Sequence, residues 1–514
     1  MLPAGPARRI LLRIAGLNAL LGSLAYARVL GLGFAYDDHW TIVDNAALGR
    51  PLGELLGSIA LARPGIEAIP DSSRPLMLAS VWLDRRLFGS DPTGFHLASL
   101  SYYALACAAV TLLLYGLSRR VRIAAAGGAF FALAPVHAEA VAAINYREDV
   151  LAGLAVALVA THVLSPRGRR ETPGPAWTMA VVLFAGLLAK ESAVALFLVL
   201  AGVVALRGYD RRWFAARTHT GVALALVTLV YGGWRAALRV RGLDNVPLAP
   251  PTDALGRLAA TARFEVEALA HSLFPLGWSP EYDPRGPASP VWLVVAAALV
   301  ATCVLFARRR STRLVAIGFA MALLAALPSS PLVGPSNERA DRYLFLSLAG
   351  GGLAWGWLAE HAARVFARRC PARWLAQPLL GSAWLSPLLL PMALACQPAL
   401  SAWKDDLTLW TVASEKAPRA FRSWVGLSRA QRLAGELPAA EASVDRALAL
   451  YPGSLSAHVT RAYVRLARGD VAGARSDIAR VRELGGARQR GLAHAAHCAE
   501  LSPEQARECI DGKR

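Results

Sequence analysis

Long apolar stretches alternate with short, arginine-rich polar stretches along most of this chain. The apolar stretches are each roughly 17–25 residues long, the length that an α-helix needs to cross a bilayer. Many of them lack the polar stripe of a soluble amphipathic helix. The pattern predicts eleven membrane-spanning helices near residues 12–34, 95–116, 121–140, 149–165, 175–190, 192–207, 218–236, 290–307, 313–331, 342–360 and 378–398.

The polar stretches predict the orientation of these spans, because Arg and Lys are enriched in cytoplasmic loops. Arginine clusters lie at 118–122, 167–170, 211–213, 307–313 and 364–369. A cytoplasmic N-terminus places all of these clusters inside. The outer segments, periplasmic or lumenal, are then 35–94, 141–148, 237–289, 332–341 and everything after about residue 398.

Composition agrees with a membrane protein. The chain has 514 residues, of which 55% are hydrophobic and 18% charged, and its net charge is +19. Strong basicity also occurs in proteins that bind nucleic acid. Here the positive charge lies between apolar stretches, where membrane topology already explains it, so we expect no nucleic acid partner.

One further apolar segment, residues 262–278, tests the number of spans. It carries Glu265 and His271, which are costly at the centre of a bilayer. Counting it as a span would also place the arginines of 307–313 outside, against the charge rule. We therefore expect an interfacial or re-entrant helix on the outer side, which leaves an odd number of spans.

The C-terminal region differs in kind, so the sequence predicts two domains, a membrane domain over 1–400 and a helical tail over 401–514. Residues 418–452 have the spacing of a tetratricopeptide (TPR) repeat, a helix–turn–helix unit. A second copy follows, with Gly469 in the place of Gly435 and Ala474 in the place of Ala440. Two repeats are few for a stable stack, so we expect the tail to pack on the membrane domain or on a protein partner.

Ionisable side chains gather on the predicted outer side. Residues 34–45 read FAYDDHWTIVDN, so Asp37, Asp38 and His39 follow directly on the first apolar stretch. A solvated loop is the alternative interpretation, and for a single loop it would be the better one. Three further clusters favour a functional site.

The first of these clusters is residues 134–149, APVHAEAVAAINYRED, which join two apolar stretches on the same side. Ionisable residues at membrane depth are costly and usually mark a site. Loop charges exposed to water are the alternative. The ionisable residues of this segment are His137, Glu139, Arg147, Glu148 and Asp149.

The other two clusters bring cations. Lys190 and Glu191 stand between two spans with almost no loop, where a local ion pair is the simplest alternative. Arg339 and Arg342 are three residues apart, so on a helix they would share one face and could grip a phosphate together. Arginine at an outer helix entrance runs against the positive-inside rule, which weakens a purely topological explanation.

Together these residues suit one kind of chemistry. A carboxylate can act as general base toward a hydroxyl, and cations can stabilise a phosphate leaving group. The combination favours transfer from a phosphate-activated donor to an acceptor hydroxyl. Because the site would lie against lipid, the donor could be a lipid phosphate, while the transferred group stays open.

A set of motifs occurs in a fixed order: YDDHWTIVDN (36–45), RPL (74–76), GFHLASL (94–100), APVHAEAVAAINYRED (134–149), AKE (189–191), PLGWSPEYD (275–283) and ERADRYLFL (338–346). With the helical tail, this set resembles the transmembrane-and-tetratricopeptide O-mannosyltransferases of the GT-C glycosyltransferase superfamily and their bacterial relatives. The resemblance implies an all-α membrane bundle of GT-C type. It also implies transfer of a sugar, typically mannose, from a polyprenyl- or dolichyl-phosphate donor to protein Ser or Thr.

The resemblance assigns roles to residues. It implies that Asp37 or Asp38 is the catalytic base and that Arg339 or Arg342 binds the donor phosphate. Animal members carry many repeats and this chain carries about two, which puts recognition of a protein acceptor in question. The acceptor is therefore expected to be either a protein or a glycan. The expected location is a bacterial inner membrane. Further substrate-binding candidates are His39, Arg74, His137, Glu139, Arg147, Asp149, Lys190 and Glu191.

Other interpretations stay open. A non-enzymatic membrane scaffold would explain the spans and the tail, but not the ionisable clusters. A transporter would place ionisable residues inside several spans, and these lie at one rim. No metal is required, although Asp37, Asp38, Glu139 and Asp149 could bind one if they converge, and Cys498 and Cys509 could pair outside the cytoplasm.

Overall fold

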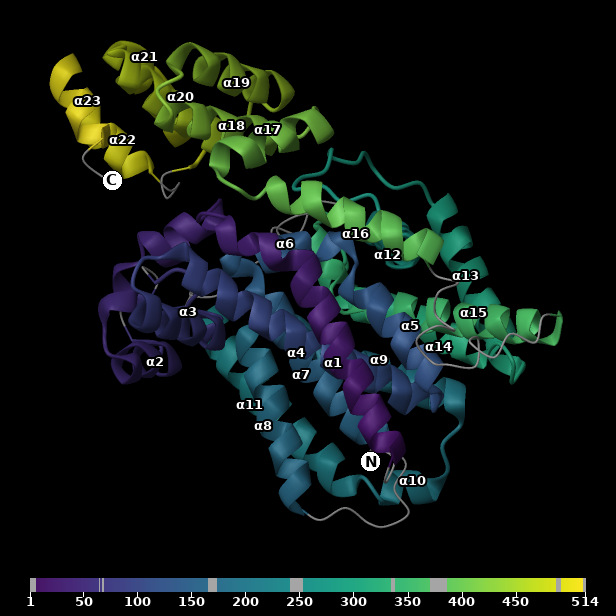
Figure 1. Ribbon diagram of the computed structural model, residues 1–514. Coiled ribbons are helices and arrows are strands. Elements are labelled where there is room, and N and C mark those ends of the chain that lie inside the picture. Colours follow the sequence, from purple (N-terminus) through teal and green to yellow (C-terminus); the bar gives the residue numbers. More distant parts are fainter. Residues whose placement is uncertain are drawn as a thin grey trace. The chain divides into compact units, whose positions relative to one another are not determined.

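The computed structural model describes residues 6–63, 65–66, 69–164, 173–240, 253–333, 338–369, 386–486 and 491–511. Within these ranges the chain is built from helices and contains no β-strand (Figure 1). The prediction of an all-α fold is therefore confirmed.

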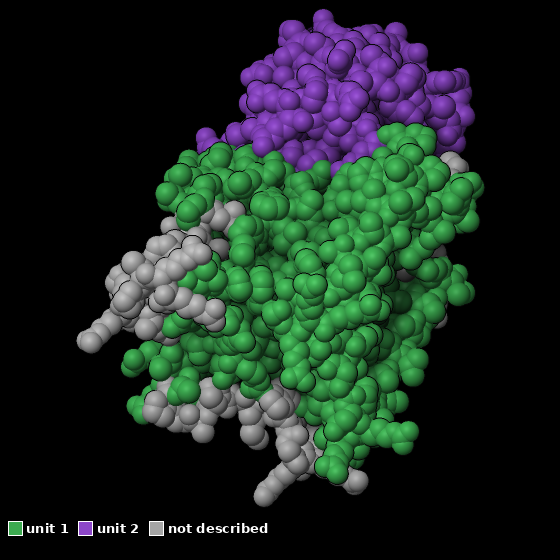
Figure 2. All heavy atoms as spheres, turned by 90° about the vertical axis from the view of Figure 1, so that its right-hand side faces the viewer, with its two compact units in different colours: residues 1–278, 286–401 green, residues 279–285, 402–514 purple. Residues whose placement is uncertain are grey.

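The chain divides into two compact units, which Figure 2 shows in green and purple. Unit 1 comprises residues 1–278 and 286–401, and unit 2 comprises 279–285 and 402–514. The short segment 279–285 belongs to unit 2 because the carboxylate of Asp283 accepts hydrogen bonds from the backbone N–H of Arg419 at 2.7 Å and from its Nε at 3.2 Å.

The longer helices of unit 1 follow the predicted apolar stretches. Helix α4 packs against α1, α5 and α7, and the further neighbouring pairs include α8 with α11 and α9 with α14. The helices are α1 (Pro6–Tyr26), α2 (Leu52–Ala60), α3 (Pro75–Phe88), α4 (Pro92–Ser118), α5 (Val121–Ala132), α6 (Ala138–Ala142), α7 (Arg147–Leu164), α8 (Pro173–Ala189), α9 (Ala195–Arg207), α10 (Arg211–Ala215), α11 (Thr218–Val240), α12 (Ala254–Leu273), α13 (Val291–Arg308), α14 (Arg313–Ala326), α15 (Ser347–Arg369) and α16 (Ser386–Ser401).

Several of these helices fit a membrane. Among the described residues, Ala7–Gly31, α4, α11 and α13 are long and apolar enough to cross one, and α5 with Pro135–Ala142 forms a fifth candidate bent by 52°. Helix α13 buries only 6% of its apolar window, against 56% for α4, which is typical of a helix that faces lipid. The number of eleven spans stays a prediction, and the beginning of the stretch 378–398 lies outside the described residues.

Helix α15 crosses three other helices at backbone contact through a run of three glycines, residues 350–352. A Cβ on these glycines would lie closer than 3.0 Å to backbone atoms of Gly318 in α14, Ser272 in α12 and Gly127 in α5. Small residues allow helices in membranes to approach this closely. The run therefore sets the position of the segment just before α15, which carries part of the candidate site.

The predicted outer loop 35–94 is folded. It forms a π-helical turn η2 (His39–Val43), a 3-10 turn η3 (Ala46–Gly49), α2 and α3. Burial of an aliphatic side chain contributes about 1.5–3 kcal/mol, and this small core holds the acidic motif in place. Its wholly buried side chains include Leu55, Ile59, Met77, Leu78 and Val81.

Unit 2 consists of short helices that pack on their sequence neighbours, such as α18 on α19 and α20 on α21. Gly435 and Gly469 turn the chain between these partners with φ angles of +80° and +85°, where glycine is favoured. Ala440 and Ala474 are wholly buried. The helices are α17 (Asp406–Lys416), α18 (Phe421–Leu433), α19 (Leu437–Leu450), α20 (Leu455–Arg468), α21 (Val471–Glu483), α22 (Leu492–Cys498) and α23 (Pro503–Asp511).

Candidate active site

Asp38 is wholly buried and anchors the first loop to the segment between α6 and α7. Its carboxylate accepts hydrogen bonds from the backbone N–H groups of Asn145 at 2.7 Å, of Ile144 at 3.2 Å and of Ala35 at 3.4 Å. Burial raises the pKa of Asp38 to about 7, although these backbone donors favour the ionised form. Asp38 therefore fixes the position of the acidic motif.

Asp37 has different surroundings. Its Oδ2 accepts a hydrogen bond of 3.0 Å from the hydroxyl of Tyr146, and its side chain is partly exposed. His39 opens the π-helical turn η2 and is partly exposed as well. Of the two acidic residues, Asp37 is thus the one that an acceptor hydroxyl can approach.

Arg342 lies on a 3-10 turn, η9 (Asp341–Leu344), immediately before α15. Its backbone N–H donates to Glu139 Oε2 at 3.0 Å, and its guanidinium forms an ion pair with the same carboxylate. The guanidinium carbon also lies 4.0 Å from the centre of the Tyr146 ring. Tyr146 therefore contacts both Asp37 and Arg342.

Lys190 joins the cluster from the end of α8. Its Nζ lies 2.6 Å from Asp149 and 3.0 Å from Glu148. Glu148 in turn pairs with Arg74 at 2.8 Å, and Arg74 reaches Glu191 at 3.3 Å. A continuous set of ion pairs thus connects the loop after α2, the beginning of α7 and the junction of α8 with α9.

A small hollow lies between these two groups of charges. Asp149 and Arg342 contribute its charged groups, and Ser192 and Ser329 contribute hydroxyls. Its remaining lining residues are Ala152, Gly153, Val156, Ala193, Ala325, Tyr343, Phe345 and Leu346. The hollow thus brings a cation, a carboxylate and two hydroxyls together beside apolar side chains.

Two further predicted site residues, Arg147 and His137, are wholly buried like Asp38. Arg147 is wholly buried and forms an ion pair with Asp84, with a further hydrogen bond to the carbonyl oxygen of Phe95 at 2.8 Å. His137 is also wholly buried, and its Nδ1 lies 3.0 Å from the Tyr103 hydroxyl. Unpaired buried polar groups are costly, and the contacts of Arg147 and His137 pair these groups. The same contacts connect segments of unit 1.

Arg339 lies apart from Arg342 in its contacts. The expected helical face is wrong, because the 3-10 turn begins only at Asp341 and Arg339 precedes it. The guanidinium of Arg339 contacts the ring nitrogens of His271 at 2.8 and 2.9 Å. The two arginines therefore do not form one pair of ligands on a helix.

The sequence analysis missed Tyr146, Asp71 and Asp84. Asp71 lies 3.6 Å from Arg74, and Asp84 balances Arg147. Tyr146 lies within the segment 134–149, next to Arg147. A tyrosine beside charged residues could have indicated that it belongs to the site. No local pattern pointed to Asp71 or Asp84, because their partners are set by tertiary contacts.

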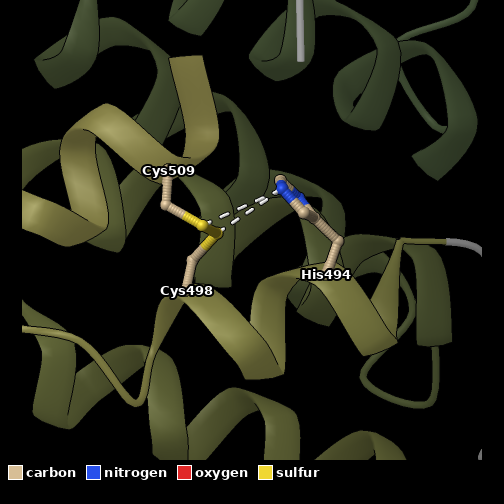
Figure 3. Close-up of side chains that lie close together, drawn as sticks. All are labelled: His494, Cys498 and Cys509. Atoms are coloured by element: carbon tan, nitrogen blue, oxygen red, sulfur yellow. Dashed lines mark hydrogen bonds between the residues drawn. A yellow bond between two sulfur atoms is a disulfide. The ribbon is translucent and has the colours of Figure 1, made fainter. Parts of the chain in front are cut away.

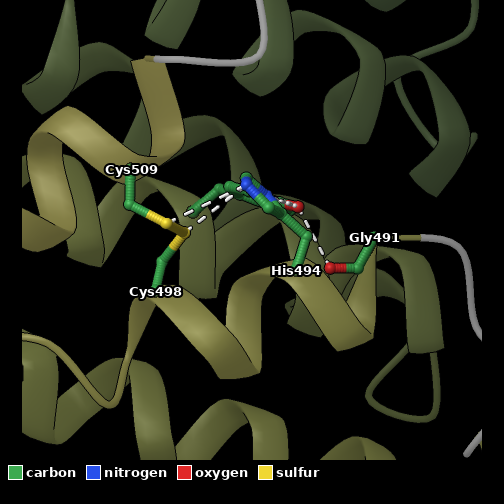
Figure 4. The surroundings of a disulfide bond; sticks show 5 residues. Gly491, His494, Cys498 and Cys509 are labelled. Carbon is green, nitrogen blue, oxygen red and sulfur yellow. Dashed lines mark hydrogen bonds between the residues drawn. A yellow bond between two sulfur atoms is a disulfide. The ribbon is translucent and has the colours of Figure 1, made fainter.

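In the described part of the chain, one group of side chains has the spacing of metal ligands: His494, Cys498 and Cys509 (Figure 3). The two cysteines form a disulfide bond, which settles a pairing that their spacing had left open (Figure 4). His494 Nε2 lies 3.5 Å from the sulfur of Cys498, and its Nδ1 lies 2.9 Å from the hydroxyl of Tyr463. A disulfide offers no thiolate to a metal, so the group is a covalent link between α22 and α23.

Among the predicted carboxylates, Asp38 faces backbone N–H groups, Glu139 faces Arg342 and Asp149 faces Lys190. These side chains could share a metal ion with Asp37 only if their carboxylates converged. Each is instead directed at its own donor. The cluster is organised around cations of the protein itself.

Fold and site together define a class: an all-helical chain with several helices of membrane-spanning length and a cluster of charges on the connections between them. Similarity to known proteins defines the class more closely. Over 197 residues the chain is 32% identical to protein O-mannosyl-transferase Tmtc2 of Drosophila melanogaster, and over 152 residues it is 36% identical to protein O-mannosyl-transferase TMTC1 of Mus musculus. The resemblance inferred from the motifs is therefore confirmed.

The similarity is partial in both directions. The match to Tmtc2 covers 37% of this chain and 21% of that protein, and the match to mouse TMTC1 covers 27% and 16%. The chain thus matches about a fifth of the length of these relatives. No family model and no solved structure matches the chain.

Proposed function

We propose that this chain is a membrane-embedded GT-C glycosyltransferase that moves a sugar, most simply mannose, from a polyprenyl-phosphate donor to the hydroxyl of a protein Ser or Thr. The observation that carries the proposal is the contact of Tyr146 with both Asp37 and Arg342, which brings an acidic group and a cation from distant segments together. The names of the relatives supply the sugar and the acceptor class.

The proposed step uses Asp37 as general base and Arg342 as phosphate ligand. Asp37 takes the proton of the acceptor hydroxyl, whose oxygen attacks the anomeric carbon of the sugar. The bond between that carbon and the phosphate oxygen breaks, and the lipid phosphate leaves with the electron pair. Because the attack comes from the face opposite the leaving group, the anomeric configuration inverts.

Charge stabilisation in this step comes from the protein. The lipid phosphate gains negative charge as it leaves, and Arg342 with Lys190 nearby supplies positive charge. Glu139 pairs with Arg342, and Asp149 and Glu148 pair with Lys190. Arg74 pairs in turn with Glu148 and Glu191. The proposed reaction requires no metal ion.

We place the site on the outer side of a bacterial inner membrane, with eleven spans, a cytoplasmic N-terminus and a periplasmic tail. The arginine clusters support this orientation. The Cys498–Cys509 disulfide supports it as well, because disulfides persist in oxidising compartments. The paired helices of unit 2 support a TPR-like tail, for which we propose a protein partner.

The decisive experiment is transfer by the purified full chain in detergent. Radiolabelled mannosyl-phosphoryl-polyprenol and Ser/Thr-rich peptides serve as substrates, and mass spectrometry locates the added hexose. We expect hexose on peptide hydroxyls. A chain that leaves the donor intact with peptide and glycan acceptors alike would contradict the proposal and favour the scaffold.

Arg342 and Arg339 provide a matched pair for the phosphate role. We expect Arg342→Lys to weaken donor binding roughly 10- to 100-fold, because a charge-assisted hydrogen bond is worth about 1.5–3 kcal/mol and Lys lacks the planar fork of Arg. Arg339→Lys should have a smaller effect, since Arg339 contacts His271. Equal donor affinities of the two variants in a titration would contradict the assignment to Arg342.

A further inference from the structure

The segment between α6 and α7 contains a tyrosine with two different contacts. Tyr146 ends a 3-10 turn, η6 (Ile144–Tyr146), directly before Arg147. Its hydroxyl donates to Asp37 Oδ2 at 3.0 Å, and its ring face receives the guanidinium of Arg342 at 4.0 Å. The two contacts use different parts of one side chain.

The backbone beside Tyr146 is held from the same direction. Asp38 accepts the N–H groups of Ile144 and Asn145, the other two residues of the turn. The ring of Tyr36 also lies 6.3 Å from that of Tyr146, edge to face. Hydrogen bonds and an aromatic contact therefore join the acidic motif to the turn.

The hydrogen bond acts on the carboxylate. A donor to an ionised carboxylate stabilises its charged form and lowers its pKa. Burial raises the pKa of Tyr146 well above 10, so its hydroxyl keeps the proton that it donates. The hydroxyl of Tyr146 thus donates to Asp37 and sets the direction of its Oδ2.

The ring acts on the guanidinium. A cation over an aromatic face is attracted by the electrons of the ring, more strongly when water is excluded. Glu139 forms an ion pair with the same guanidinium, which also lies 5.1 Å from the centre of the Tyr343 ring. Arg342 is thus held by a carboxylate and by aromatic rings, of which Tyr146 is the nearer.

We propose that Tyr146 is a positioning residue that holds the general base and the phosphate ligand in one geometry, its hydroxyl orienting Asp37 and its ring orienting Arg342. This inference rests on the proposed function. The side chain takes no part in bond making, so it is distinct from the catalytic pair. Its two parts can be removed separately.

Three variants of the full chain in detergent separate these contributions. Tyr146→Phe removes the hydroxyl and keeps the ring, Tyr146→Leu removes both, and Tyr115→Phe is a matched control on α4, away from the cluster. The measurements are kcat and KM for mannosyl-phosphoryl-polyprenol between pH 5 and 9, binding of the same donor by tryptophan fluorescence, and thermal stability.

For Tyr146→Phe we expect kcat to fall about tenfold, with donor binding and KM nearly unchanged. The acidic limb of its pH–rate profile should move to higher pH, because Asp37 loses a donor that favours its ionised form. For Tyr146→Leu we expect weaker donor binding, about three- to tenfold, in addition to the loss in kcat. Tyr115→Phe should match the wild type.

The results separate two kinds of failure. If the wild type transfers mannose while both Tyr146 variants keep its kcat, KM and pH profile, the inference is overturned and the proposed function stands. A fall in thermal stability alone, with unchanged kinetics, overturns it as well. A wild type that neither binds the donor nor transfers the sugar overturns the proposed function itself, and this inference with it.

Discussion

Asp37 and Asp38 are neighbours in the chain, yet their contacts give them different tasks. Asp38 is wholly buried against backbone N–H groups, whereas Asp37 is partly exposed and accepts a hydrogen bond from a tyrosine. A turn explains the difference, since consecutive side chains of a helical turn point in different directions. The acidic motif thus combines an anchor and a candidate base.

This difference predicts unequal effects of two matched variants. Asp37→Asn should lower the transfer rate by at least about 100-fold with little change in thermal stability, since general base catalysis contributes 10²–10⁴-fold. Asp38→Asn should mainly lower thermal stability, because its amide N–H₂ group would face backbone donors. Kinetics and melting curves of both variants check this. A stable Asp37→Asn variant with normal activity would exclude Asp37 as the base.

Asp38 also predicts a pH dependence of stability. Its pKa is raised from 3.8 to about 7 in the folded chain, so the folded state binds more protons than the unfolded state between these values. Stability should therefore fall as pH rises from about 4 to 7. We expect the melting temperature to rise on acidification from pH 8 to 5, and this rise to be smaller in Asp38→Asn. The same slope in both proteins would contradict the assignment.

At the scale of elements, helix α15 depends on its three glycines. Residues 350–352 allow backbone contact with α14, α12 and α5, and the 3-10 turn that carries Arg342 precedes this helix directly. A shift of α15 would therefore move the guanidinium relative to Glu139. Packing far from any ligand thus contributes to the geometry of the site.

We expect Gly352→Ala to lower stability by about 1–3 kcal/mol, because overpacking in a close contact forces the backbone apart. Gly232→Ala on α11 is the control, since nothing lies within 4 Å of a Cβ there and alanine favours a helix. Melting temperatures in detergent and donor affinity are the measurements. An unchanged Gly352→Ala variant would mean that the crossing adapts easily.

At the scale of the whole molecule, the disulfide of unit 2 bears on the side of the membrane. Cys498 and Cys509 are bonded across eleven residues, and Cys107, Cys303 and Cys396 are buried free thiols in unit 1. An oxidising compartment favours the bond. The tail is therefore expected outside the cytoplasm, as the charge pattern predicts.

Labelling of thiols tests this orientation. Cells are quenched in acid, and the unfolded chain is treated with N-ethylmaleimide before and after reduction. We expect Cys498 and Cys509 to react only after reduction, while Cys107, Cys303 and Cys396 react before it. Free thiols at both tail positions would place the tail in a reducing compartment and argue against the proposed orientation.

The local pattern of residues was enough to predict much of this chain. Apolar stretches predicted helices, because the hydrophobic period and length of a helix are properties of neighbouring residues. The two turn glycines of the tail were predicted from the spacing of the repeat, which is likewise a property of residues close together in the chain. Motif order also predicted the relatives, since each motif is a continuous segment.

The residues that each site side chain contacts could not be predicted from the local pattern. The ion pair of Arg342 with Glu139 joins residues 203 positions apart, and the hydrogen bond of Tyr146 with Asp37 joins residues 109 apart. Such contacts follow from how helices cross, which a local pattern does not contain. The sequence therefore predicted the same phosphate-binding role for Arg339 and Arg342. In the folded chain their contacts differ: Arg339 contacts His271, and Arg342 contacts Glu139 and Tyr146.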